Sequence, residues 1–543
     1  MTASAAPPVP RRVGVAISTA DREIFPLVAA ALARRGVEVV VRLDLPDRPA
    51  PDRLSRLLLA ADRFVSRWLP GSVRPTNTAS DAPGRTGLKI EEGLTDGLAI
   101  EAVVIVGPSP SPRPAAFEGA DLYHLEVGAS RPGFPEVPGA FEVLTRRGVA
   151  VLRLSPIGCS TGGFRGGEMA VQAHLRSIHR TGSTLLASLP DFLDVALRPG
   201  DPGAEAVAPP PRQGGPADPV RPGATGVATH LTGLVFGLVE RVLFRFQWGL
   251  AAMPAPRTGQ SPDWAALRPT PQPADRIWAD PFLVRRDDRN WLFFEDAPFI
   301  SDKGADIGHL SVVEIDRDGR LVGDPVVVLD SPSHLSYPNV FEHDGEWYLL
   351  PETGSLGRIE LYRCTRWPDG WERHSTLVED YQGYDASIVP SGGRFWMFVA
   401  RRAKGVGTTD FLDLFSAASP LGPWTPHPQS PVVQDVRSAR PGGRILRLGD
   451  RLVRPAQDSS GGLYGRALRL QDVTRLDESG FEEDWGAVIE PNPRGGVIGV
   501  HSLAWNEEVI VIDICRRIPR LRLLRGLAPS LRLPLVIERA PDQ

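Results

Sequence analysis

The sequence of 543 residues predicts an α/β domain followed by an all-β domain, a five-bladed β-propeller. In the first part, apolar β-branched runs alternate with segments of helical spacing, which is typical of α/β folds. In the second part, one hairpin pattern returns roughly every 50 to 60 residues, a period that indicates a propeller or an array. Between them, residues 201–228 are rich in proline, glycine and alanine. We therefore expect an N-terminal domain at 1–200, a linker at 201–228 and a propeller at 229–530.

The first domain begins as a βαβ unit, because two apolar strands flank a helix. Residues 11–18 and 37–43 have the composition of buried strands, and residues 21–35 place Phe25 and Leu32 on one helical face. Such a unit joins parallel strands, so we expect a parallel sheet. The remaining expected elements are strands at 102–106, 121–127 and 149–154 and helices at 53–69 and 166–197, the last with a break near Gly182.

Each copy of the repeat is a short apolar strand, a polar or glycine-containing turn, and a second apolar strand. This order is typical of an antiparallel hairpin. The first strands begin near Trp278, Ser336, Tyr384, Ala439 and Ile498, and the second strands near Trp291, Trp347, Phe395, Leu452 and Val509. A β-sandwich is the alternative, but sandwich strands do not repeat as units. Five copies therefore predict five blades, with the first strands lining a central channel.

Composition and charge disfavour several classes of function. The net charge is −4 and the arginines are interspersed with acidic residues, so we expect no nucleic-acid partner. Three cysteines, Cys159, Cys364 and Cys515, do not form a disulfide pattern and fit a reducing compartment. Residues 1–12 lack the apolar core of a signal peptide. We expect a cytoplasmic protein.

The longest apolar run, residues 231–250, is interrupted by Glu240, Arg241, Arg245 and Gln247. A membrane-spanning helix would have to bury these polar groups in lipid at considerable cost, so we expect no transmembrane segment. An amphipathic helix that leads into the propeller is the favoured interpretation. Peripheral contact with a membrane surface is the alternative.

Three motifs of the first domain point to a known family. They are Leu-Tyr-His at 122–124, a Pro-Gly-Phe-Pro loop at 132–135 and a glycine-rich turn at 158–163. With the opening strand, they resemble the N-terminal domain of formyltransferases, which use formyl-tetrahydrofolate to formylate amino sugars or initiator tRNA. The resemblance implies that His124 manages protons, and that formyl-tetrahydrofolate is the cofactor if the domain is active.

The same motifs depart from the formyltransferase pattern at two positions. Leu122 stands at the place of the family's asparagine, and Cys159 or Ser160 stands at the place of its aspartate. Neither the oxyanion donor nor the carboxylate is then available. We therefore predict that formyl transfer is lost, with a purely structural role for His124 as the alternative to a catalytic one.

The propeller motifs lie at the starts of first strands and the ends of second strands. Ala-Asp-Pro at 279–281 and Tyr-Asp-Ala at 384–386 resemble the openings of blades one and three in five-bladed glycosidases that cleave arabinan and xylan. A longer set comprises Trp-Ala-Asp-Pro-Phe at 278–282, Phe-Phe-Glu at 293–295, Lys-Gly at 303–304, His-Leu-Ser-Tyr-Pro at 334–338, Leu-Pro-Glu-Thr at 350–353 and Arg-Pro-Ala-Gln-Asp at 454–458. This set resembles the N-terminal propeller of plant glucosamine inositolphosphorylceramide transferases, over residues 245–515.

That propeller also occurs in bacterial proteins behind a formyltransferase-like half. The resemblance therefore implies a bacterial protein of glycan or glycolipid metabolism. In the plant proteins, glycosyl transfer belongs to a separate domain, so the resemblance does not carry transfer to this chain.

The glycosidase resemblance implies carboxylates from different blades that converge on the axis. We expect Asp280 and Asp385 to meet there, one activating water and the other tuning protonation. In that pattern the general acid opens blade four, where this sequence has Arg440, which cannot give up a proton. Glu352 and Glu295, at the ends of second strands, are the candidates for the missing acid.

Further residues are candidates for binding a ligand. Arg440 could clamp a carboxylate or phosphate, and His501 resembles the channel histidine that lies near a central cation in the glycosidases. Trp278 and Tyr337 could stack on sugar rings, although core packing is the favoured interpretation for most of the aromatic residues. Asp458 is a more distant acidic candidate. The sequence assigns no set of metal ligands.

The sequence thus predicts a sugar or glycolipid headgroup in the propeller channel, with hydrolysis or transfer of a glycosidic bond as the chemistry. A non-catalytic glycan-binding or scaffold protein is the first alternative. In it, the aspartates and glutamates only cap turns and pair with arginines. A sugar N-formyltransferase is the second alternative.

Overall fold

The computed structural model describes residues 12–18, 23–45, 59–60, 62–64, 91–92, 101–106, 120–128, 138, 140–157, 164–199, parts of 230–243, and then 244–256, 262–299, 307–402, 407–491, 496–520 and 535–538. The chain divides into two compact units, Met1–Val239 and a second formed by Glu240–Arg402 with Gly407–Gln543. The predicted linker at 201–228, the loop at 132–135, Cys159 and Ser160 lie outside the described residues. Within the described ranges, no helix is long and apolar enough to cross a membrane.

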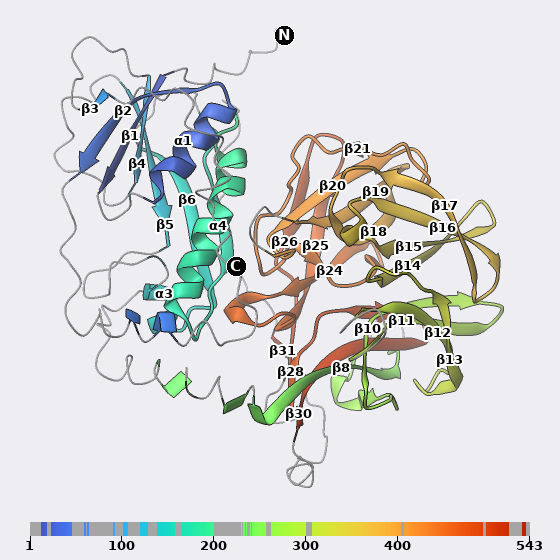
Figure 1. The fold of residues 1–543 in the computed structure, drawn as a ribbon. Helices are drawn as coiled ribbons and strands as arrows, with labels where there is room; N and C mark the ends of the chain where they lie inside the picture. Colours follow the sequence, from blue (N-terminus) through green and yellow to red (C-terminus); the bar gives the residue numbers. More distant parts are fainter. Residues whose placement is uncertain are drawn as a thin grey trace. The chain divides into compact units, whose positions relative to one another are not determined.

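The N-terminal unit contains a seven-stranded sheet in the order β3-β2-β1-β4-β5-β6-β7 (Figure 1). The strands are β1 (Arg12–Ser18), β2 (Glu38–Leu45), β3 (Glu91–Glu92), β4 (Ala102–Val106), β5 (Asp121–Val127), β6 (Val149–Ile157) and β7 (Gly167–Gln172). As expected, β1 pairs in parallel with β2 and β4, and β4 with β5. The expectation of a wholly parallel sheet is wrong for β6 and β7, which run antiparallel to their neighbours. No crossover helix is needed between β6 and β7, because antiparallel strands can be joined by a short connection.

The helices α1 (Phe25–Arg34), α3 (Ala140–Leu144) and α4 (Ile178–Ala196) accompany this sheet. The first lies within its predicted range. The predicted helix at 166–197 is wrong at its start, because Gly167–Gln172 pair as β7 and Ser177 caps α4 by accepting a hydrogen bond from the amide of Arg180. The helix is not interrupted at Gly182, where a Cβ atom would lie 2.9 Å from the carbonyl oxygen of Pro138. This glycine allows a close approach instead of a break.

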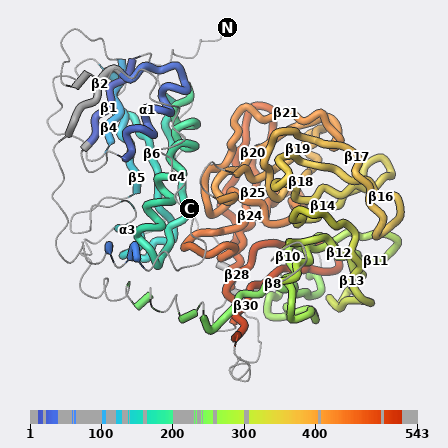
Figure 2. The backbone as a smooth tube through the Cα atoms, in the orientation of Figure 1, coloured from blue at the N-terminus to red at the C-terminus, as the bar shows by residue number. Residues whose placement is uncertain are grey.

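The second unit is a five-bladed propeller, as predicted (Figures 1 and 2). Blades one to three are four-stranded. Blade one contains β10 (Arg276–Arg286), β11 (Arg289–Pro298), β12 (His309–Ile315) and β13 (Leu321–Leu329). Blade two contains β14 (Ser336–His343), β15 (Glu346–Glu352), β16 (Ile359–Arg366) and β17 (Gly370–Val378). Blade three contains β18 (Gly383–Ser391), β19 (Arg394–Arg401), β20 (Phe411–Ala417) and β21 (Thr425–Pro426).

Blade four is built on β22 (Arg440–Pro441), β24 (Arg451–Asp458), β25 (Ala467–Leu476) and β27 (Val488–Pro491). The short β23 (Leu446–Leu448) and β26 (Phe481–Asp484) pair with β24 and β25, and β31 (Leu535–Glu538) pairs with β27. The first strands of neighbouring blades contact one another, β10 with β14, β14 with β18 and β18 with β22. They are therefore the innermost strands, nearest the axis.

Blade five is closed by strands from both ends of the propeller. It combines β28 (Val497–Gly499), β29 (Leu503–Trp505) and β30 (Val509–Pro519) with the earlier β8 (Phe244–Pro254) and β9 (Arg268–Pro269). The strands β8 and β30 pair along their whole length. The predicted helix at 231–250 is therefore wrong from Phe244 onward, because β30 would otherwise present an unpaired edge.

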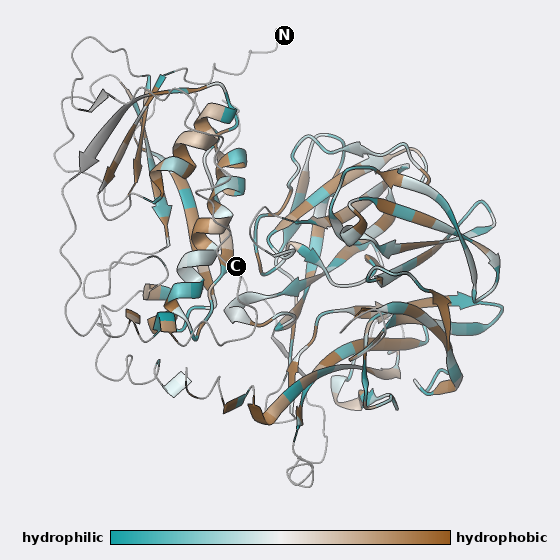
Figure 3. Cartoon of the chain, in the orientation of Figure 1, coloured by the Kyte–Doolittle hydropathy of each residue, from teal (hydrophilic) through white to brown (hydrophobic). Residues whose placement is uncertain are grey.

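Apolar clusters fill the spaces between neighbouring blades, and Figure 3 shows hydrophobic residues along the strands of the propeller. Between blades five and one, Leu250 and Val511 pack with Trp278 and Phe294. The other four junctions have similar buried clusters. Each large apolar side chain buried in this way contributes about 1.5–3 kcal/mol. This packing holds the inner strands in fixed relative positions.

Candidate functional site

Three innermost strands share a backbone distortion at the same position. The register shifts around Asp280 in β10, Tyr337 in β14 and Asp385 in β18, and these residues have positive φ angles of 49°, 50° and 56°. Positive φ is uncommon outside glycine, and such strain is typical of functional sites. A bulge also turns a side chain away from the regular alternation of the strand. All three residues consequently bond with residues of other blades.

Asp385 is buried against two residues of blade four. Nε of Arg440 donates to Oδ2 of Asp385 at 2.6 Å, a second guanidinium nitrogen donates to Oδ1 at 3.3 Å, and the amide of Gln457 donates to Oδ2 at 2.9 Å. Arg440 also bonds Thr408 and lies 3.6 Å from Oε2 of Glu352. Burial disfavours the charge of Arg440, but its neighbours, Asp385 first among them and Glu352 as well, together outweigh this effect, so the pKa of Arg440 is raised well above its usual value. Both oxygens of Asp385 are occupied, which favours a positioning role.

Asp513 of β30 holds His501 and Asp280 together. Its Oδ1 accepts the backbone N–H groups of His501 and Ser502 at 2.9 Å, and its Oδ2 accepts the backbone N–H of Asp280 at 3.1 Å. Nδ1 of His501 lies 2.8 Å from Oδ2 of Asp513, and Nε2 lies 3.4 Å from Oδ1 of Asp280. Burial disfavours the imidazolium, but the neighbouring carboxylates outweigh it and raise the pKa of His501. Burial, although opposed by His501, raises the pKa of Asp280 well above its usual range.

Two glutamates complete this group. Glu352 of β15 accepts a hydrogen bond from the hydroxyl of Ser336 at 3.1 Å, and Oε1 of Glu295 in β11 lies 3.6 Å from Nε2 of His334. Burial, reinforced by the charge of Asp385, raises the pKa of Glu352 to about 7 and that of Glu295 to about 8. Carboxyl groups with a pKa near neutrality suit proton donation. We call Asp280, Glu295, Glu352, Asp385, Arg440, His501 and Asp513 the axial cluster.

The register of the blades explains how these residues meet. Glu295, Glu352 and Gln457 lie opposite Ala279, Ser336 and Arg440, and the backbone of Asp513 bonds that of Ser502. These four residues occupy equivalent positions on the second strands of blades one, two, four and five. At this position the side chain therefore faces the axis. The sequence motifs did not identify Gln457 and Asp513 as site residues. An alignment of the repeat copies that compared Phe-Phe-Glu, Leu-Pro-Glu, Pro-Ala-Gln and Val-Ile-Asp could have found both.

Asp458 has contacts that separate it from the cluster. It follows Gln457, so alternation places its side chain on the opposite face of β24. Its Oδ2 lies 2.7 Å from Arg469 and 3.4 Å from Arg466. Burial acts to raise the pKa of Asp458, but the two arginines outweigh it and lower the pKa. These ion pairs favour a structural role over ligand binding or proton donation.

Trp278 and Tyr337 do not have the exposure that sugar stacking requires. Trp278 is buried between blades five and one, with its ring 4.9 Å from that of Phe294. Tyr337 is fully buried, and its hydroxyl donates to the carbonyl of Gly443 and accepts from the same residue's N–H group. Both side chains therefore have core contacts.

Three other aromatic residues, which we call the aromatic rim, surround the charged groups. The guanidinium carbon of Arg440 lies 5.2 Å from the ring of Tyr464 and 5.8 Å from that of Tyr384. The ring of His501 lies 4.2 Å from that of Trp248 and 5.2 Å from that of Tyr464. Tyr464 is 40% exposed. A partly exposed ring beside polar groups is suited to stacking against a sugar. Tyr384 opens the third copy of the repeat, whereas no repeat pattern marks Trp248 and Tyr464, which come from other parts of the fold.

Asp280, His501 and Asp513 have the chemistry to hold a cation. Their ligand atoms lie within 4.8 Å of one another. Oδ1 of Asp280 accepts no hydrogen bond from the residues that the structure describes. Two carboxylates and an imidazole suit a divalent cation. A protonated His501 that bridges both carboxylates satisfies the same groups, so the residues fit either arrangement.

In the N-terminal unit, His124 lies on β5 and is partly buried. Its Nδ1 is 4.0 Å from Oε1 of Glu126, whose other oxygen pairs with Arg153 at 3.0 Å. Leu122, at the place of the asparagine, is buried. The described residues therefore offer His124 a neighbouring carboxylate, but no side-chain amide at position 122.

The fold and the axial cluster define a class of protein, a five-bladed propeller whose innermost positions bring together five carboxyl groups, one arginine and one histidine. Residues 266–492 match the family model described as "Glucosamine inositolphosphorylceramide transferase 1, N-terminal". Over 208 residues the chain is 35% identical to glucosamine inositolphosphorylceramide transferase 1 of Oryza sativa subsp. japonica, covering 38% of this chain and 27% of that protein. The Arabidopsis thaliana protein of the same name is 32% identical, with 38% and 26% covered. The chain thus spans about a quarter of the length of these relatives.

Three solved structures are also similar to parts of the chain. A family 117 glycoside hydrolase from Zobellia galactanivorans is 12% identical and has a TM-score of 0.32, covering 49% of this chain and 91% of that chain. An exo-β-1,3-galactanase from Clostridium thermocellum is 12% identical, with a TM-score of 0.31 and 40% and 53% covered. An α-L-arabinanase from Cellvibrio cellulosa is 14% identical, with a TM-score of 0.30 and 42% and 82% covered. The number of blades rests on the strand pairing of the chain itself.

Proposed function

We propose that the propeller binds a sugar, or the sugar-bearing headgroup of a glycolipid, at the axial cluster and the aromatic rim, and cleaves or transfers a glycosidic bond there. The observation that carries this proposal is a set of buried carboxyl groups, two with a pKa near neutrality, beside the partly exposed residue Tyr464. The names of the plant relatives, which refer to glucosamine and inositolphosphorylceramide, support the same class of ligand.

For hydrolysis, the proposal assigns one proton acceptor and one proton donor. Asp280 accepts a proton from the water that attacks the anomeric carbon, in the ionised form that burial opposes and the charge of His501 favours. Glu352 or Glu295 gives its proton to the leaving oxygen as the glycosidic bond breaks. Asp385, predicted as catalytic, instead positions Arg440 and Gln457, because both of its oxygens accept hydrogen bonds.

The charge of the cluster restricts where a phosphorylated ligand can lie. The cluster offers no free cation to a phosphate, because Asp385 engages Arg440 and Asp513 lies 2.8 Å from His501. Arg440 also donates a hydrogen bond to Thr408. A glycolipid would therefore place its sugar at the axial cluster and its phosphate away from it.

Sugar binding without turnover is the second candidate function, and it is favoured by a specific observation. Arg440 stands where the glycosidase resemblance requires a general acid, and its raised pKa keeps it charged. In this case the carboxylates would only hold sugar hydroxyl groups.

A titration with arabinosides, xylosides, glucosamine and glucosaminyl-inositol tests both candidates. Wild type should bind at least one of them, and Tyr464→Ala should weaken binding by about 0.5–1.5 kcal/mol if its ring is the platform. Release of free sugar that is abolished in Asp280→Asn and in either Glu352→Gln or Glu295→Gln indicates catalysis, whereas weaker binding without turnover in any variant indicates recognition alone. Asp477→Asn, an exposed aspartate, is the control and should change neither quantity. Absence of binding to every sugar would remove the proposal.

For the N-terminal unit, we propose a formyltransferase-like fold that has lost formyl transfer. The parallel strands β1, β2, β4 and β5, and Leu122 two residues before His124, support this proposal. Incubation with formyl-tetrahydrofolate and a panel of amino sugars should therefore yield no formylated product. Product formation that disappears in His124→Ala would contradict it.

A further inference from the structure

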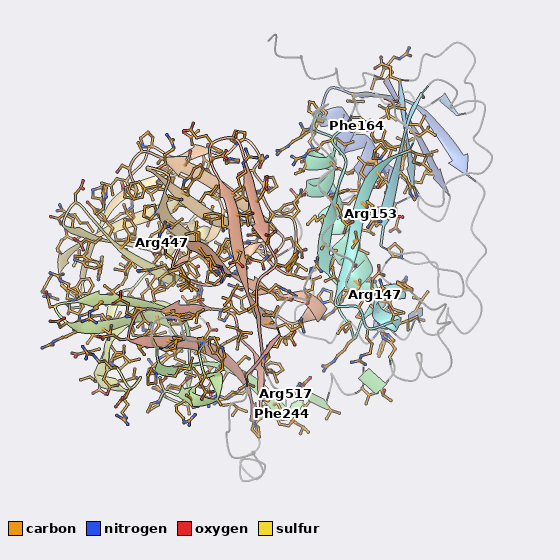
Figure 4. All side chains as sticks on the ribbon, turned by 180° about the vertical axis from the view of Figure 1, so that it is seen from behind. Arg147, Arg153, Phe164, Phe244, Arg447 and Arg517 are labelled. Atoms are coloured by element: carbon orange, nitrogen blue, oxygen red, sulfur yellow. The ribbon has the colours of Figure 1, made fainter. Side chains whose placement is uncertain are left out.

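The ends of β8 and β30 form a two-stranded extension of blade five. Residues 244–246 pair with residues 517–519, whereas β28 contacts β30 only at 515 and 516, and β9 contacts β8 only at 251 and 252. Among the described strands, this extension therefore has no third strand. A ribbon of two strands cannot bury both of its faces. We call residues 242–247 and 516–520 the ribbon tip, and Figure 4 labels two of its residues, Phe244 and Arg517, close together.

The ribbon tip exposes apolar side chains. Val242, just before β8, is 70% exposed, and Phe246 is 40% exposed. Phe246 lies directly opposite Arg517, so an apolar and a charged side chain share one face of the ribbon.

The charged residues of the ribbon tip are almost all basic. Arg245, Arg516, Arg517 and Arg520 belong to it, and the neighbouring acid, Glu240, is buried and pairs with Arg517 at 2.7 Å. Neither Arg245 nor Arg520 forms an ion pair with a carboxylate of the described residues. Their guanidinium groups donate to the backbone carbonyls of Ala274 and Phe244. From Ile514 to Ile537 the sequence contains six arginines and no acidic residue.

We propose that the ribbon tip docks the protein on an anionic membrane surface. Val242 and Phe246 enter the headgroup layer, and Arg245 and Arg520, which pair with no carboxylate of the described residues, bind lipid phosphates. Interfacial segments of other proteins combine apolar and basic residues in this way, because apolar burial and attraction to anionic lipid add together. Guanidinium groups also match the geometry of phosphate oxygens. This inference concerns a surface outside the axial cluster and does not depend on the proposed sugar site.

Co-sedimentation of the full chain with vesicles tests the proposal. The protein should pellet with vesicles of phosphatidylcholine mixed with phosphatidylserine, pellet much less with phosphatidylcholine alone, and be released by salt. Arg520→Glu and the double variant Val242→Glu with Phe246→Glu should each weaken partitioning by about tenfold, because both the charge and the apolar area contribute.

Two matched controls lie elsewhere on the propeller. Val326→Glu changes a valine of β13 that is 49% exposed, and Arg447→Glu changes an exposed arginine, labelled in Figure 4. Both should bind vesicles as wild type does. Circular dichroism melts of every variant show whether the fold is intact, and the exposed Arg520→Glu keeps the test informative if the double variant is unfolded.

Three outcomes would overturn the proposal. The first is no pelleting with anionic vesicles, and the second is an equal loss in the control and ribbon variants. The third is a ribbon variant that changes the oligomeric mass in sedimentation velocity while vesicle binding stays constant, which would assign the ribbon tip to contact with a second copy of the chain.

Discussion

At the scale of the residue, the acids of the axial cluster differ in how firmly they are held. Asp385 and Asp513 accept two or more hydrogen bonds each, whereas no described side chain donates a hydrogen bond to Glu295. Burial next to other acids raises the pKa of Glu295 and Glu352, while the firmly paired Asp458 has a lowered pKa. A buried acid without strong partners therefore binds a proton more readily than a firmly paired one. Because such pKa values differ between the folded and unfolded states, the stability of the protein depends on pH.

Glu295→Gln should stabilise the protein at alkaline pH. The pKa of Glu295 is about 8 in the folded state against an ordinary 4.5, so its contribution to the free energy of unfolding is complete below pH 4.5 and is lost as the pH rises to about 8. Glutamine removes the buried charge, so Glu295→Gln should raise the free energy of unfolding above pH 8 by about 2 kcal/mol. This gain is smaller than the maximum that the pKa shift allows, at about 1.36 kcal/mol per pKa unit. Urea denaturation at pH 4.5 and 8.5 measures the difference.

Glu360→Gln is the matched control for this prediction. Glu360 lies on β16, and Arg358 and Arg373 approach its Oε1 at 2.7 and 2.9 Å. Despite some burial, these partners lower its pKa, so its stabilising contribution is present above pH 4.5 and lost at lower pH. Glu360→Gln should therefore destabilise the protein at pH 8.5. Equal destabilisation by both variants at that pH would contradict the assignment of Glu295.

Arg440→Met should be strongly destabilising. It leaves Asp385 and Glu352 buried without their cation, and removal of one partner of a buried ion pair costs about 3–5 kcal/mol. Adding Asp385→Leu should recover a large part of the loss, because the uncompensated charge is then gone. Denaturation of both single variants and the double variant gives the coupling energy. A purely additive result would exclude a direct Arg440–Asp385 interaction.

At the scale of the element, the innermost strands and the closing strand have separate effects. The bulges of β10, β14 and β18 turn Asp280, Tyr337 and Asp385 toward other blades, whereas β8 supplies the partner for β30 that completes the ring. The geometry of the axial cluster therefore depends on closure, since His501 and Asp513 both belong to blade five.

Leu250→Ala tests this dependence on β8. Leu250 is fully buried between blades five and one, and replacing a buried leucine by alanine costs about 2–5 kcal/mol. Val322→Ala on the outer strand β13, at an exposed position, should change stability by less than about 0.5 kcal/mol. Chemical denaturation followed by tryptophan fluorescence compares the two. Similar losses in the free energy of unfolding for the two variants would show that packing of β8 contributes little to the stability of the propeller.

At the scale of the whole molecule, the N-terminal unit extends beyond the predicted linker. Asp62 accepts the backbone N–H groups of Ile178 and His179 at the start of α4, at 3.1 and 2.7 Å. Nε2 of His230 lies 3.0 Å from Oδ1 of the same carboxylate, and both side chains are buried. His230, two residues after the linker, is thus part of the N-terminal unit, where it bonds the carboxylate that offsets the positive end of α4.

Proteolytic cleavage within 201–228 should therefore leave the two fragments associated. The linker composition makes it the expected site of cleavage. The fragment that begins after the cut carries His230, which stays buried against Asp62. The fragments should co-elute in gel filtration, and His230→Ala should separate them or lower the melting temperature of the N-terminal unit. The exposed His374→Ala is the control. Separation of wild-type fragments under native conditions would contradict the prediction.

The repeat pattern of the sequence predicted the five blades, and the motifs at its strand ends predicted most of the axial cluster. Asp280, Glu295, Glu352, Arg440 and His501 were all selected from these positions, and the structure brings their charges together. Periodicity was sufficient here because side-chain alternation and a repeated blade length place equivalent residues on the same face. It was insufficient for Trp278, Tyr337 and Asp458, since residue type does not show which side of a strand faces the core.

What the sequence by itself determined is the class of each part, an α/β unit and a five-bladed propeller, together with the polar residues at the ends of the innermost strands. Only the tertiary structure decided the rest. It made β6 and β7 antiparallel and turned residues 244–250 of an expected helix into part of β8, the strand that closes the ring. It also placed both oxygens of Asp385 in hydrogen bonds, whereas burial raises the pKa of Glu295 and Glu352. The physical reason is that strand pairing, hydrogen-bond occupancy and desolvation depend on partners distant in the chain, which local residue patterns do not encode.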